Sequence, residues 1–112
     1  MEEENSLVAT AVDLINATLL VSFRNNVYLK LTDYFLECEK HAALENPDVD
    51  FGSLFLIYKK AQEEINKETD RSKILDILHD AYRDMLFTAY DNEIDFDKVA
   101  KEKVETENTE IE

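Results

Sequence analysis

The sequence predicts an all-α protein with one folded domain, and three observations support this prediction. The chain has 112 residues, which is the size of one ordinary domain. It contains only one Gly and one Pro, whereas β-sandwiches and barrels need many turn residues. Its apolar residues recur at spacings of three and four, as in amphipathic helices. We therefore expect an antiparallel four-helix bundle with a short fifth helix or an acidic C-terminal tail.

The first expected helix, from Asn5 to Phe23, is almost without charge. Asp13 is its only ionised residue, although Asp, Glu, Lys and Arg make up 34% of the chain. Asn5 or Ser6 is the expected N-cap. Its apolar side chains surround most of the helix, which is typical of a helix covered by several neighbours or by a partner chain. They are Leu7, Val8, Ala9, Ala11, Val12, Leu14, Ile15, Ala17, Leu19, Leu20, Val21 and Phe23.

We expect this helix to end at Arg24–Asn26, because Asn tolerates turn geometry. A second helix then runs from Val27 to just before Pro47, which disfavours helical geometry in the preceding residue. Its predicted buried stripe is Val27, Leu31, Tyr34, Phe35, Cys38 and Ala42. Two alternatives stay open: residues 18–31 could form a hairpin, or the first two helices could join as one.

Two further helices complete the predicted bundle domain, which covers residues 5–90. Asp50 or Ser53 begins the third helix, and Asp70 or Ser72 begins the fourth, which runs to Tyr90. Their predicted buried faces are Phe51, Leu54, Phe55, Tyr58, Ala61 and Ile65 on the third, and Ile74, Leu75, Leu78, Ala81, Tyr82, Met85, Leu86 and Ala89 on the fourth.

Residues 91–112 are predicted to be a separate acidic segment. A short helix with Asp95 as its cap is predicted there, because Phe96, Val99, Ala100 and Val104 keep helical spacing, and Glu105 to Glu112 would be a solvated tail. The segment holds nine acidic residues and three lysines, a net −6 of the total charge of −14. So negative a chain disfavours contact with nucleic acid or anionic lipid and favours a basic protein partner.

Facing carboxylates are the strongest indication of chemistry. Glu63, Glu64 and Glu68 could face Asp76, Asp80 and Asp84, as in the magnesium sites of all-α nucleotide pyrophosphohydrolases, although the spacing differs from the pattern of those enzymes. His79 follows Asp76 at the i, i+3 spacing of di-iron bundles, but a second such pair is missing. A metal-dependent helical-bundle enzyme is thus the alternative hypothesis, and its ligands would be Glu64, Glu68, Asp76, His79 and Asp80.

Other chemical motifs are weak. Asp91, Glu93, Asp95, Asp97 and Glu102 match positions of a calcium loop, yet Phe96 stands where that loop requires Gly. The chain has no glycine-rich phosphate loop and no cluster of cysteines. Cys38 is the single cysteine, so it forms no intrachain disulfide, and the acidic N-terminus is unlike a secretory signal. We therefore expect a cytoplasmic protein without a cofactor or a membrane span.

Together these features predict a non-enzymatic protein–protein interaction module, a small acidic regulator, inhibitor or adaptor with a basic partner. A homodimer through the first helix is also expected, because its apolar rows exceed what one pair of neighbouring helices covers. The predicted partner-binding residues combine steering acids with one apolar anchor. They are Asp48, Asp50, Asp91, Glu93, Asp95, Phe96 and Asp97.

Overall fold

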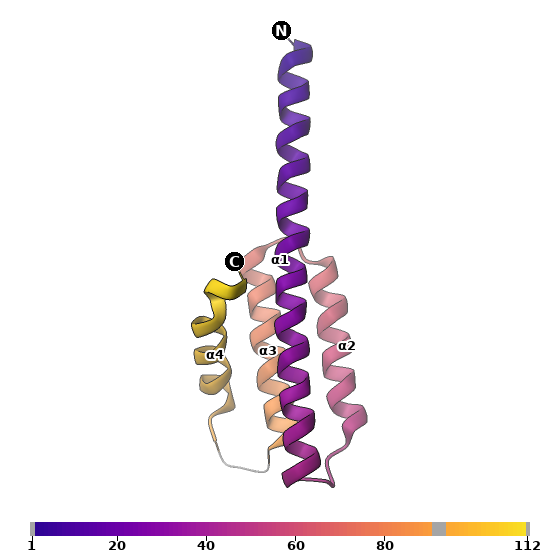
Figure 1. Ribbon diagram of the computed structural model, residues 1–112, viewed down its shortest axis with the longest axis vertical. Coiled ribbons are helices and arrows are strands. Elements are labelled where there is room, and N and C mark those ends of the chain that lie inside the picture. Colours follow the sequence, from indigo (N-terminus) through magenta and orange to yellow (C-terminus); the bar gives the residue numbers. More distant parts are fainter. Residues whose placement is uncertain (1, 91–93, 112) are drawn as a thin grey trace.

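The computed structural model describes the backbone of residues 2–90 and 94–111, with side chains for residues 9–90, 94–108 and 111 (Figure 1). This part of the chain forms four helices and no strand, which confirms the all-helical prediction. The helices are α1 (Glu2–Glu45), α2 (Phe51–Lys67), α3 (Arg71–Ala89) and α4 (Phe96–Ile111).

Helix α1 is continuous through Arg24–Asn26, so the expected break and the alternative hairpin are wrong. The other alternative, in which the first two predicted helices join as one, is confirmed. The expected caps Asn5 and Ser6 also lie inside this helix, which begins at Glu2. None of the three residues at the expected break is Gly or Pro, and two of them are tied to other helices. Arg24 donates from Nε to the carbonyl of Glu68 at 3.0 Å, and Asn26 donates to the carbonyl of Ile111 at 3.0 Å. These tertiary bonds outweigh the weak preference of Asn for turns.

Two predicted N-caps are confirmed. The carboxylate of Asp50 accepts from the backbone N–H of Gly52 at 2.9 Å and begins α2. The carboxylate of Asp70 accepts from the N–H of Ser72 at 2.9 Å and of Lys73 at 3.4 Å, and begins α3. Each side chain satisfies N–H groups that the first helical turn leaves without an intrahelical partner.

The C-terminal part of α1 is packed among the other helices, each of which contacts it, and α3 also contacts α2 and α4. The connection from α1 to α2 lies at one end of the packed body, and the connection from α2 to α3 lies at the other (Figure 1). The N-terminal half of α1 extends beyond that second end. None of the described helices has the length and apolar character needed to cross a membrane.

The core is built from one apolar stripe on each helix, largely as the spacing predicts. The buried side chains are Phe23, Val27, Leu31, Tyr34, Cys38 and Ala42 on α1, Leu54, Tyr58, Ala61 and Ile65 on α2, Ile74, Leu78, Ala81, Tyr82, Met85, Leu86 and Ala89 on α3, and Phe96, Ala100, Val104 and Ile111 on α4. On the described part of α1 the buried stripe begins at Phe23, and the guanidinium of Arg71, in α3, lies 5.1 Å from the centroid of the Phe23 ring.

Helix α4 continues through Glu105–Ile111, which differs from the solvated tail expected there. Ile111 is buried, and Glu107 pairs with Lys30 at 3.1 Å and with Lys103 at 3.1 Å. The hydroxyl of Tyr34 also donates to Glu107 at 3.0 Å. The described part of the acidic segment is therefore packed against α1 and α3 rather than held apart from the bundle.

The alternation of buried and exposed leucines on α1 gives a test of this packing. Leu31 is fully buried, whereas Leu29 is 61% exposed. We expect Leu31→Ala to lower the free energy of unfolding by about 2–5 kcal/mol, because it removes buried methyl groups and leaves a cavity. The matched control Leu29→Ala should change it by less than about 0.5 kcal/mol. Urea denaturation measures both, and equal losses would contradict the packing.

Candidate interaction site

The N-terminal half of α1 stands alone beyond the other helices (Figure 1). We call residues 9–21 the arm. All its side chains are exposed except Leu20, which is partly buried. Its large apolar side chains have the following exposed fractions: Leu14 64%, Ile15 59%, Val21 52%, Leu19 51% and Val12 48%. A continuous apolar surface of this kind is typical of an interaction site, unlike isolated exposed leucines.

The apolar side chains of the arm form two rows. Row one contains Val12, Ile15 and Leu19, and row two contains Ala11, Leu14 and Val21. At about 100° per residue the rows lie roughly 120° apart around the helix axis. The stripe that faces the bundle continues into the arm through Leu20, Asn16 and Asp13 instead. The two rows therefore point away from the direction of α2 and α3 and are not an unfinished part of the bundle core.

The arm has few means of stabilising its own helix. Asp13 is its only charged residue, so ion pairs between successive turns cannot form within it. Five of its thirteen residues are β-branched, which lowers helix propensity: Thr10, Val12, Ile15, Thr18 and Val21. Short helices without packing are marginal in water. A helix of this composition is typical of one that is stabilised by a neighbour.

Sequence reasoning missed a second exposed apolar feature on α1. Leu29, Leu36 and Leu44 are 61%, 53% and 70% exposed. They follow Leu14 and Val21 at spacings of eight, seven and eight residues. The signal was present in the sequence, because these leucines fall outside the predicted buried stripe. They extend the exposed apolar surface from the arm along the packed part of α1.

The predicted partner-binding acids before α2 have mainly local roles. Asp48 is exposed in the loop between α1 and α2. Asp50 is the N-cap of α2, and its carboxylate also accepts from the hydroxyl of Ser53 at 2.9 Å. The hydrogen bonds from Ser53 and from the N–H of Gly52 hold the pKa of Asp50 below its ordinary value.

The predicted binding residues before and within α4 are used inside the chain. Phe96, the predicted apolar anchor, is buried within the described chain, and its ring centroid lies 6.1 Å from those of Phe87 and Tyr90. The Oδ1 of Asp95 accepts from the N–H of Lys98 at 3.2 Å, in the first turn of α4. The carboxylate of Asp97 pairs with the side chains of His79 and Arg83, as described below. Asp91 and Glu93 lie outside the described residues.

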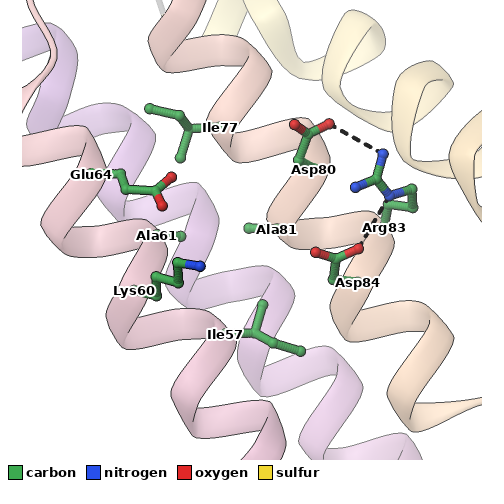
Figure 2. A pocket seen from close by; sticks show the side chains of 9 residues that line it. All are labelled: Ile57, Lys60, Ala61, Glu64, Ile77, Asp80, Ala81, Arg83 and Asp84. Atoms are coloured by element: carbon green, nitrogen blue, oxygen red, sulfur yellow. Dashed lines mark hydrogen bonds and ion pairs between the residues drawn. The ribbon is translucent and has the colours of Figure 1, made fainter.

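The carboxylate rows of α2 and α3 meet at an open depression of about 340 Å³ (Figure 2). Glu64 lies on one side, and Asp80 and Asp84 lie on the other. Lys60 and Arg83 line the same depression, and Arg83 reaches Asp80 at 3.4 Å and Asp84 at 3.2 Å. The cations interleaved with the acids therefore supply the countercharge that a metal ion would otherwise provide.

The five residues of the metal hypothesis are distributed over three depressions. Glu64 and Asp80 share the one above, and Glu68 lines a second with Lys67 and Lys73. Asp76 and His79 line a third, between α3 and α4, with Asp97 and Lys101. Among the described residues, no group of three or more His, Cys, Asp or Glu side chains could hold a metal ion.

His79 joins α3 to α4 through acidic partners. Its Nδ1 lies 3.0 Å from Oδ1 of Asp80, and its Nε2 lies 3.3 Å from Oδ1 of Asp97. Arg83 also contacts Asp97, at 3.4 Å. These contacts are typical of a polar network that joins two helices. The partners of His79 are Asp80 and Asp97, not Asp76, with which it was expected to form a metal-ligand pair.

The remaining candidates for chemistry are part of the core. Burial, with a smaller effect from the charge of Glu37, raises the pKa of the Cys38 thiol to about 12, so the reactive thiolate is suppressed. The ring of His41 is stacked on Tyr90 with centroids 3.6 Å apart. Tyr34 and Tyr82 are stacked with centroids 4.0 Å apart, and each hydroxyl donates to a carboxylate, of Glu107 and of Glu37.

No family model matches this chain, and no curated protein or solved structure matches it either. The site therefore has to be interpreted from its own residues.

The buried tyrosines predict a loss of stability at alkaline pH. Burial, together with the adjacent carboxylates, raises the pKa values of Tyr34 and Tyr82 above the ordinary value of 10.0. Above about pH 10 the unfolded chain releases these protons while the folded chain keeps them, so the free energy of unfolding should fall as pH rises. Urea midpoints at pH 8 and pH 10.5 measure the fall.

Tyr82→Phe is the matched control for this prediction. It lowers stability at pH 8 by about 1 kcal/mol, because the hydrogen bond to Glu37 is lost. Its urea midpoint should fall less between the two pH values, since the linked proton of Tyr82 is absent while those of Tyr34 and of the Cys38 thiol remain. An identical fall in both proteins would show that general charge repulsion, not Tyr82, causes the effect.

Proposed function

We propose that this chain is a non-enzymatic protein–protein interaction module that acts through the arm. The observation that carries the proposal is the exposure of Val12, Leu14, Ile15, Leu19 and Val21 on a helix that no other part of the described chain covers. Removal of such a surface from water is worth about 25 cal/mol for each Å² of apolar area. A surface of this kind favours binding to another protein over exposure.

In this proposal the packed helices form an antiparallel bundle that holds the arm in place. Arg24 and Asn26 connect the start of the packed part of α1 to the carbonyls of Glu68 and Ile111. The arm therefore leaves the bundle as a continuation of a helix that is fixed by tertiary contacts. The bundle fixes the direction of the arm, and the arm makes the contact with the partner protein.

The acidic surface adds a second, finer element to the proposal. With a net charge of −14, the chain would attract a partner with a basic surface and repel nucleic acid. Because Asp50, Asp95 and Asp97 are used within the chain, this attraction would come from the field of the whole bundle. A role as regulator, inhibitor or adaptor of a basic protein is consistent with this arrangement.

Site-specific photo-cross-linking tests the proposal. A photoreactive amino acid at Ile15, in row one, should give covalent adducts with a protein in cells of the source organism. The matched control is the same amino acid at Leu56, which is 67% exposed on α2, away from the arm. We expect adducts at Ile15 at several times the yield at Leu56. No adduct at Ile15, or equal yields at both positions, would overturn the proposal.

A further inference from the structure

We infer that the arm is covered by the arms of other copies of this chain, and that four arms pack together as antiparallel neighbours. The inference rests on the proposed function and names its partner. It follows from the exposed area of the chain, from the two separate rows of the arm, and from the symmetry of each row.

The exposed area is too large for a monomer of this mass. The chain exposes 7607 Å². A compact monomer of 13.0 kDa is expected to expose roughly 6,300 Å², which leaves an excess of about 1,300 Å². A standard protein–protein interface covers about 800 Å² on each partner. The excess therefore exceeds what one standard interface buries, and it fits two smaller contacts for each chain.

The two rows require two neighbours. A single helix packed on the arm covers one row, because the side chains of that row pack between side chains of one partner helix. Row one and row two lie roughly 120° apart around the axis, so a helix on one row leaves the other exposed. An arm with both rows covered therefore has two neighbouring helices, as in a four-helix assembly.

The central part of each row can face the same part of an antiparallel copy. Leu14 of row two has an alanine three residues away on either side, Ala11 in the same row and Ala17 next to the row. In row one, Val12 and Ile15 are equally distant from a point between Asp13 and Leu14. An antiparallel copy can thus place Leu14 opposite Leu14 on one row, and Val12 opposite Ile15 on the other. The two centres lie half a residue apart along the helix, about 0.75 Å at 1.5 Å per residue, so the two-fold axes of a tetramer can intersect close to Leu14.

The charge distribution supports copies of the chain over a charged foreign partner. The arm has one charge, at Asp13, and neither row contains it, so a basic helix would find no complementary charge there. Each chain has a net charge of −14, and the bundles repel one another. Antiparallel arms reduce this repulsion, because neighbouring bundles then lie at opposite ends of the assembly.

The test is the mass of the full-length protein by sedimentation, with one charge introduced into each row. Wild type should have four times the monomer mass of 13.0 kDa. Ile15→Glu disrupts row one and Leu14→Glu disrupts row two, so each single variant should have twice the monomer mass. The double variant should be a monomer. Leu56→Glu, on the exposed face of α2, is the matched control and should keep the mass of wild type.

Folding of the variants is checked independently, because both substitutions lie outside the bundle. Each variant should keep a cooperative urea transition, followed by the near-ultraviolet circular dichroism of Tyr34 and Tyr82. Its free energy of unfolding should match that of wild type diluted until it dissociates, within about 0.5 kcal/mol. The mass of wild type should also hold or rise at 0.5 M salt, since salt screens repulsion between the bundles. Dissociation by salt would show that ionic contacts hold the copies together and would contradict apolar packing of the arms.

Three outcomes would overturn the inference. A wild-type monomer at all concentrations excludes self-association, and if Ile15 still gives adducts with another protein, the proposed function survives without it. A wild-type dimer that only one of the two substitutions dissociates excludes the second neighbour. A single variant that is already a monomer excludes two independent contacts. Absence of both adducts and self-association would remove the proposed function as well.

Discussion

The structure depends on a mismatch of helix lengths. Helix α1 has 44 residues, and at 1.5 Å per residue it is about 66 Å long, whereas the 17 residues of α2 and the 19 of α3 cover less than about 30 Å. The longest dimension of the molecule, 66 Å, is therefore that of α1 alone. Three short helices bury one stripe from Phe23 to Ala42, and nothing in the described chain covers the arm. Both the core and the exposed surface follow from this single difference.

The parts of the fold that could be predicted from the sequence are those with local causes. Asp50 and Asp70 cap helices through bonds to residues two or three positions away, and the buried stripes follow the helical period. The continuity of α1 has a tertiary cause, because Arg24 and Asn26 bond to carbonyls 44 and 85 residues distant. The helix up to Ile111 depends likewise on contacts with α1, since its own composition is that of a solvated segment.

The candidate site also has some features with local causes, which the sequence predicts, and others that depend on tertiary packing. The scarcity of charge between Asn5 and Phe23 indicated a helix covered by neighbouring helices or by a partner chain. That residues 9–21 are exposed depends on where α2 and α3 end, which the helical spacing of apolar residues does not determine. Of the acids that resembled a metal site, Glu64 and Asp80 line one depression, whereas Glu68 and Asp76 line two others. Lys60 and Arg83 line the first depression together with its acids, and Arg83 pairs with Asp80 and Asp84. These cations could not be placed beside the acids from the sequence, because their positions depend on how α2 and α3 pack. Phe96 was predicted to be an anchor for a partner. Its ring contacts with Phe87 and Tyr90 could not be predicted from the spacing of apolar residues, because they depend on how the end of α3 packs against the start of α4.

The continuity of α1 also bears on how strongly the arm can bind. If the arm were a separate helix, forming its first helical turn would cost free energy. The arm instead continues a helix that is already formed in the bundle. Its direction is fixed at Arg24 and Asn26, so a partner meets a surface that is already oriented. Ordering of flexible segments is one of the main costs of association, and a mounted arm reduces that cost. The bundle therefore contributes to binding without touching the partner, through the geometry it imposes on residues 9–21.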